Sequence, residues 1–199
     1  MVPKLFRREN LNAFRNEYNL CQHEVHTFNE IVEASNANDL EKLKWFTLFG
    51  DRMYQILLNV HAYRKGLEFG FELIDFDRYG WLRKPVFLDQ EELKLGIVEM
   101  DRYGTYSTIT LGHGPNGMWA YGMSINYGTA GSSCGICVHD ERFSSRESAL
   151  NEALMKLKNK MELHAGDSDT VNYNQKIILA TLKSIKAFKI KQVQLSLFA

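Results

Sequence analysis

Residues 106–127 read YSTITLGHGPNGMWAYGMSINY, and this stretch decides the fold class. Two runs rich in β-branched and aromatic side chains, 106–111 and 119–127, lie on either side of the glycine-rich segment 112–117. Runs of this kind favour β-strands, and Gly, Pro and Asn between them favour a tight turn. The stretch therefore predicts an antiparallel hairpin.

Two short runs extend this hairpin into a meander. Residues 97–100 (Ile-Val-Glu-Met) and 136–138 (Ile-Cys-Val) are also rich in β-branched and apolar residues, so we expect an antiparallel meander over about residues 96–139. The preceding segment, 67–95, stays undecided, because its apolar residues alternate like a strand and also suit a helical stripe. Pro85 excludes a central strand at its own position.

The N-terminal part predicts two helices. Apolar residues over 11–32 recur at spacings of three and four, which places them on one helical stripe. A second stripe runs over 40–60, and Gly66 is suited to end it. A short loop joins the two stripes, so the simplest arrangement of residues 1–66 is a helical hairpin.

Two helices are expected after the meander. Residues 144–147 (Ser-Ser-Arg-Glu) carry the Ser-x-x-Glu pattern of a capping box. That pattern opens a predicted helix over about residues 145–163, which would cover one face of the sheet. A last helix is expected over about 169–187, and regular structure should stop near Phe188.

The complete pattern predicts an α+β protein in three parts. An N-terminal helical hairpin (1–66) precedes an α+β domain (67–187), and a flexible tail (188–199) follows. With 45% hydrophobic residues, the chain of 199 residues has enough apolar surface for a core without cross-links. Basic and acidic residues are equal at 24 each, so any contact with nucleic acid must come from a local patch.

The sequence shows neither export nor membrane signals. No apolar run follows the N-terminal charges, and no stretch of about 18 uninterrupted apolar residues occurs. Cys21, Cys134 and Cys137 are too few, and odd in number, for a disulfide scaffold, which favours a reducing compartment. We therefore expect a cytoplasmic protein without a membrane partner.

The end of the chain carries its most specific motif, which consists of Gln194, Leu195, Ser196, Leu197 and Phe198. This motif resembles, with no departure, the pentapeptide by which bacterial DNA polymerases, mismatch-repair proteins and replication regulators bind the DNA sliding clamp. The resemblance implies that Leu197 and Phe198 enter a hydrophobic cleft. It also implies that Gln194 hydrogen-bonds at the edge of the cleft, that Leu195 fills a shallower site and that Ser196 connects them.

This resemblance predicts a bacterial sliding clamp as partner and a position at the nucleoid through that clamp. An apolar pair at a free chain end also favours a binding role, because such side chains are costly to leave in water. A structural alternative stays open. Val193, Leu195 and Leu197 alternate, so they would also suit an edge strand or pack back on the last helix.

Nucleic-acid contact is a second expectation. Its candidates are the lysines of a basic stripe and two rings expected to be exposed: Lys183, Lys186, Lys189, Lys191, Tyr106 and Tyr127. Ammonium groups beside a clamp would meet DNA phosphates, and exposed rings stack on bases. A solvated helix face explains the lysines equally well. Trp119, Tyr121 and Met123 share one strand face and are expected in the core.

Metal-ligand residue types occur in two places. Cys134, Cys137 and His139 resemble half of a zinc site, since two thiolates on a tight turn can hold one ion. The other half is missing, so ordinary half-buried cysteines are preferred. His23 and His26 lie one helical turn apart but off the apolar stripe, which favours a solvated face. We therefore expect no metal and no cofactor.

The remaining sequence gives the setting. Residues 117–122 and 143–150 loosely resemble a strand-strand-helix module of uncharacterised phage and plasmid proteins. No phosphate-binding loop, catalytic triad order or nuclease carboxylate set is found. The sequence therefore favours a non-enzymatic accessory factor of DNA replication or repair from a mobile element. Two alternatives stay open: a nuclease-like enzyme that uses the tail for recruitment, and a single-stranded nucleic-acid-binding protein.

Overall fold

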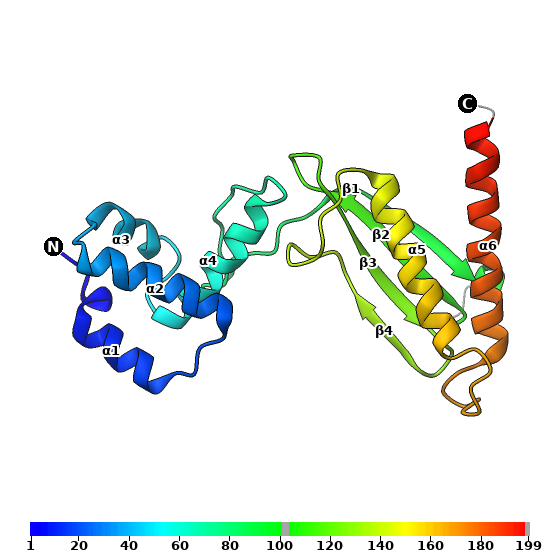
Figure 1. Cartoon of the computed structure of the whole chain (residues 1–199), viewed down its shortest axis with the longest axis horizontal. Coiled ribbons are helices and arrows are strands. Elements are labelled where there is room, and N and C mark those ends of the chain that lie inside the picture. The colour runs from blue at the N-terminus through cyan, green and yellow to red at the C-terminus, as the bar shows by residue number, and fades with distance from the viewer. Residues whose placement is uncertain (101–103, 198–199) are drawn as a thin grey trace. The chain divides into compact units, whose positions relative to one another are not determined.

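The computed structural model describes residues 1–100 and 104–197. The chain divides into two compact units, Met1–Pro85 and Val86–Ala199. Figure 1 shows helices in the first unit, and a sheet with two helices in the second. The predicted α+β class, with N-terminal helices and a C-terminal helix, is confirmed. No helix in the described ranges combines the length and apolar character needed to cross a membrane.

The first unit contains more helices than expected, because each predicted helix is divided in two. The first stripe breaks where Tyr18 is extended and the N–H of Cys21 donates to the Glu24 carboxylate over 2.8 Å, which caps a new helix. The second breaks at Gly50, whose φ of 141° glycine adopts without strain. The elements are η1 (Lys4–Phe6), α1 (Arg8–Glu17), α2 (Gln22–Asn36), α3 (Leu40–Thr47) and α4 (Met53–Leu67).

Asn59 holds the segment after α4 to the first unit. Its amide group donates to the carbonyls of Phe49 and Gly80 over 2.8 and 2.9 Å, and its amide oxygen accepts from Leu82 N–H over 2.9 Å. The side chain is buried with these hydrogen bonds made, which is the condition for keeping a polar group in a core. Residues 68–85 therefore belong with the helices.

The second unit is built on a four-stranded antiparallel sheet in the order β1-β2-β3-β4. Its elements are β1 (Leu88–Gly96), η2 (Val98–Met100), β2 (Tyr106–His113), β3 (Trp119–Asn126), β4 (Gly131–Cys134), α5 (Arg146–Leu163) and α6 (Gln175–Leu197). The predicted meander and its central hairpin are confirmed. The outer two strands lie elsewhere than expected, because 97–100 includes a 3-10 turn and 136–138 follows β4.

Gly122 explains why 136–138 is not a strand. A Cβ atom at this position would lie 2.7 Å from both the carbonyl oxygen of Cys134 and the backbone nitrogen of Ile136. The chain after β4 therefore crosses directly against the middle of β3, where only glycine leaves room. This crossing covers the face of the sheet opposite the helices.

Helices α5 and α6 cover the other face, where Leu93, Ile109 and Met123 lie in register across three strands. Trp119, Tyr121 and Met123 pack against this core, as predicted. The predicted helix after the meander is also confirmed. Its N-cap is Ser145 and not Ser144, because Ser145 Oγ accepts the N–H of Ser148 over 3.1 Å.

The last helix differs from expectation at both ends. It begins at Gln175 instead of residue 169, and it continues to Leu197 where an end near Phe188 was expected. The prediction of a tail without regular structure from residue 188 is therefore wrong up to Leu197. The physical reason lies in the sequence: no Gly, Pro, Asn or Asp occurs after Gln175, so nothing stops the helix.

Candidate functional site

The candidate site is α6, and its first half is fixed to the sheet. Ile178 and Ile185 are buried in the core. Thr181 is fully buried, and its hydroxyl donates to the carbonyl of Ile177 over 2.9 Å. Ser184 Oγ accepts the N–H of Gly96 at the end of β1 over 3.3 Å. These contacts set the direction in which the rest of the helix runs.

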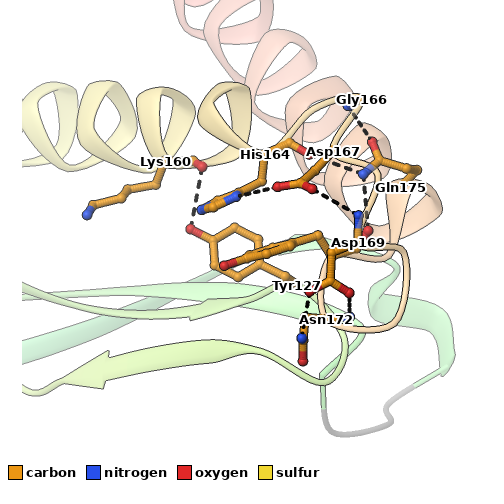
Figure 2. Close-up of polar contacts among 9 residues, drawn as sticks. Tyr127, Lys160, His164, Gly166, Asp167, Asp169, Asn172 and Gln175 are labelled. Carbon is orange, nitrogen blue, oxygen red and sulfur yellow. Dashed lines mark hydrogen bonds and ion pairs between the residues drawn. The ribbon is translucent and has the colours of Figure 1, made fainter.

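The connection between α5 and α6 is fixed by the polar network in Figure 2. The ring of His164 stacks on Tyr173 with centroids 3.8 Å apart, and its Nδ1 lies 3.3 Å from an Asp167 carboxylate oxygen. The side chain of Gln175 accepts the N–H of Gly166 over 2.8 Å and donates to the carbonyl of His164 over 3.1 Å. The start of α6 is therefore tied to the end of α5.

Two residues of this network, Asp167 and Tyr127, have shifted pKa values. Asp167 has a pKa below its usual value, because the backbone N–H of Asp169 and then the His164 side chain donate to the charged carboxylate. Burial raises the pKa of Tyr127, and its hydroxyl donates to the carbonyl of Lys160 over 3.4 Å. The network therefore positions a helix junction, and it could not be predicted from the sequence because its members are spread over residues 127–175.

The second half of α6 leaves the sheet. Phe188 still packs against the core, whereas Lys189, Ile190, Lys191 and Gln194 are exposed. Figure 1 shows this red end of the helix extending past the strands of its own unit. We call residues 189–197 the α6 arm. The exposed side chains described on the arm add little packing of their own, so helical hydrogen bonds matter most at these positions.

The clamp-like motif lies at the end of the arm. Gln194 is exposed in the last turns of α6. For Leu195, Ser196 and Leu197 the structure describes the helical backbone only, and Phe198 lies outside the described residues. The alternative of a last edge strand is wrong for residues up to Leu197, because these form a helix.

The lysines of the predicted basic stripe are all exposed on α6: Lys183, Lys186, Lys189 and Lys191. The helix from Gln175 to Leu197 contains no Asp or Glu. With about 100° between successive residues, Lys183, Lys186 and Lys191 fall within roughly 140° of one another, opposite the buried Ile185. The chain has no net charge, yet the charged side chains of this helix are all positive.

The two tyrosines proposed for base stacking differ from what was expected. Tyr127 is only 7% exposed and belongs to the core, so the prediction of an exposed ring is wrong there. Its position just after β3, below the end of α5, accounts for the burial. Tyr106 is half-buried, and the Lys94 ammonium group lies 5.0 Å from the centre of its ring. Base stacking by Tyr106 stays a prediction.

Cys134 is the exposed last residue of β4, and the half-buried Cys137 and the exposed His139 follow it. Cys134 and Cys137 are free thiols, and the N–H of Cys137 donates to Asp140 over 2.7 Å. Within residues 1–100 and 104–197, neither cysteine nor His139 belongs to a trio of closely spaced ligand atoms. The trio that does occur in those ranges lies in the first unit, at Cys21, His23 and Glu24.

Comparison of the chain with protein-family models, with curated proteins and with solved structures finds no match. Function is therefore argued from the residues and their geometry alone.

Proposed function

We propose that this protein is an accessory factor of DNA replication or repair that is recruited to DNA by a bacterial sliding clamp. The observation that carries the proposal is the motif Gln194–Phe198 at the end of a helix whose last turns extend from the folded unit. A recognition peptide must be accessible, and the exposed Lys191 and Gln194 beside and within the motif support this. The setting in a phage or plasmid belongs to the same proposal.

Docking requires the motif to leave the helix. In the clamp-binding pentapeptides that it resembles, an extended backbone places the apolar side chains in the cleft. Unwinding the last residues of a helix costs little, since each residue adds only a small favourable free energy to the helix. Burying Leu195, Leu197 and Phe198 would contribute roughly 4.5 to 9 kcal/mol, so binding after ordering costs should be micromolar at the tightest.

The lysine face of α6 gives the arm a second use in this proposal. A clamp encircles DNA, so a helix that leads into its peptide cleft approaches the phosphate backbone. Exposed ammonium groups without acidic neighbours on the same helix would then add salt-dependent affinity. Lys183 and Lys186 lie on the half of α6 that packs on the sheet, so they would keep their positions when the motif unwinds.

Titration of the intact protein against a bacterial sliding clamp tests the proposal. We expect micromolar binding that the double variant Leu197→Ala, Phe198→Ala loses. The matched control is Leu179→Ala, Ile190→Ala, which removes two exposed apolar side chains from the same helix outside the motif. Equal binding by all three proteins, or no binding by the intact chain, would refute a role of the motif in clamp recruitment.

A further inference from the structure

A cluster of metal-ligand side chains lies at the start of α2. Cys21 Sγ, a ring nitrogen of His23 and a carboxylate oxygen of Glu24 all lie within 4.8 Å of one another. Cys21 and His23 are exposed, whereas Glu24 is 5% exposed. Because all three residues belong to one helix start, little backbone freedom remains to be lost when they bind a common ion.

The spacing within the cluster suits zinc. Sγ of Cys21 lies 3.3 Å from Nδ1 and 3.4 Å from Nε2 of His23. A tetrahedral zinc ion with bonds of about 2.3 Å to sulfur and about 2.0 Å to nitrogen separates those two ligand atoms by about 3.5 Å. Because Sγ is almost equally far from both ring nitrogens, it lies over the face of the His23 ring. A zinc ion binds in the plane of an imidazole, so the Cys21 side chain must rotate toward one nitrogen while the His23 ring keeps its place.

Glu24 is positioned to act as the third ligand. Its carboxylate is buried beside the other two side chains, so little movement would bring it to a shared ion. Oε2 already accepts the N–H of Cys21 over 2.8 Å. A carboxylate has further lone pairs, so it can keep this bond and also bind a cation.

His61 supports the cluster from a second helix. Its ring, on α4, stacks on the His23 ring with centroids 4.2 Å apart and planes 26° apart. A surface hollow of about 610 Å³ runs past His23, His26 and His61. Cys21 and His23 are exposed, so an ion at the cluster would be reached from solvent and could keep a fourth position open to water.

We propose that Cys21, His23 and Glu24 form a zinc site, with His61 as a positioning residue that holds the His23 ring. The mixture of one thiolate, one imidazole and one carboxylate matches the ligand preferences of zinc among common cellular divalent cations. Binding displaces the thiol proton of Cys21 to solvent. The ion would join three side chains at the capping box and so stabilise the N-terminal end of α2.

The test uses the intact, untagged chain, freed of metal with a chelator and titrated with zinc or with cobalt as a spectroscopic substitute. We expect one ion per chain, proton release on binding and a thiolate-to-cobalt charge-transfer band. Cys21→Ser and His23→Ala should each lower the affinity at least about tenfold and remove or weaken this band. Serine is itself a good N-cap, so Cys21→Ser removes the soft ligand without removing the capping residue.

Three control variants make the result specific. His26→Ala changes an exposed histidine one turn further along α2, and Cys134→Ser, Cys137→Ser removes the other two thiols. Both should bind as the native chain does, and His61→Phe should also bind, because phenylalanine keeps the ring stacking. The proposal is overturned if no thiolate band forms, if the band survives in Cys21→Ser, or if the Cys134, Cys137 variant abolishes it.

Discussion

Helices α5 and α6 lie on the same sheet, but their buried residues extend over different fractions of their lengths. Buried residues of α5 run from Ala149 to Met161, so core contacts extend over almost the whole helix. On α6 the buried side chains among those described run from Ile177 to Ile185, and the helix continues to Leu197. α5 also mixes acidic and basic side chains, whereas α6 has lysines only. Helix α5 therefore serves the core over most of its length, whereas α6 packs on the sheet in its first half and continues as the arm.

The first prediction compares stability along the two helices. Leu154→Ala on α5 and Ile185→Ala on α6 remove side chains that are 0% and 2% exposed, so each should destabilise the second unit by about 2 to 5 kcal/mol. Ile190→Ala on the arm should change stability by less than about 0.5 kcal/mol. Urea dependence of hydrogen exchange in peptides of the sheet measures this unit alone. A large effect of Ile190→Ala would mean that the arm is packed.

The second prediction compares the charges of the two helices. Lys183→Gln, Lys186→Gln should reduce the slope of log affinity against log salt by about 1.8 for DNA carrying a loaded clamp, because two phosphate contacts are lost. Lys158→Gln, Lys160→Gln on α5 is the matched control and should leave the slope unchanged. Equal slopes for both variants would leave the lysine face of α6 as an ordinary solvated surface.

The third prediction concerns the conformation of the arm. Gln192→Pro should break α6 just before the motif, since proline removes a helix hydrogen bond and clashes with the preceding turn. If the motif docks extended, this variant no longer has to unwind residues 193–197, and its clamp affinity should rise about two- to fivefold. Gln192→Ala is the helix-preserving control. Weaker binding by the proline variant would show that the helical form is the one recognised.

The smallest expected effect concerns the ion pair that joins α5 to β1. Arg146 donates to Glu91 through Nε over 2.7 Å, and this hydrogen bond is the main reason that the pKa of Glu91 lies below 4.5. Both side chains are 45% exposed, so Glu91→Gln should cost less than about 1 kcal/mol.

Because the folded-state pKa of Glu91 is lowered, the contribution of this ion pair is present above pH 4.5 and disappears as the pH falls through the lowered pKa. Urea unfolding of both proteins at pH 7 and at acid pH checks it: a stability difference that persists in acid would assign the effect to packing.

Local sequence signals predicted the parts of the fold that local physics decides. The hairpin β2–β3 and the start of α5 follow from residue types that favour strands, turns and caps whatever surrounds them. β4, by contrast, is Gly-Ser-Ser-Cys with every residue exposed, so it exists only through pairing with β3. β1 contains the exposed Asp89, Glu91 and Glu92, and these charged residues obscure the strand pattern of the inward-facing Leu93 and Leu95 in the sequence. Pairing of this kind cannot be seen in either segment alone.

In the candidate sites, too, the sequence predicts continuous features and misses those that depend on residues distant in the chain. The motif Gln194–Phe198 is a continuous peptide, so the sequence contains all of it. The position of Tyr127 in the core depends on α5 and on Tyr173, which are distant in sequence. The Cys21 cluster was missed because a single apolar stripe over 11–32 predicted an unbroken helix, with no capping turn to bring the three side chains together.

Hydrogen exchange of the intact protein with and without a bacterial sliding clamp tests the proposed role of the α6 arm most directly. If the arm carries the clamp-binding peptide, the clamp should slow exchange in the peptide over residues 189–199 and leave the peptides of α5 unchanged. Unchanged exchange over residues 189–199, or protection confined to the sheet or to the N-terminal unit, would contradict it.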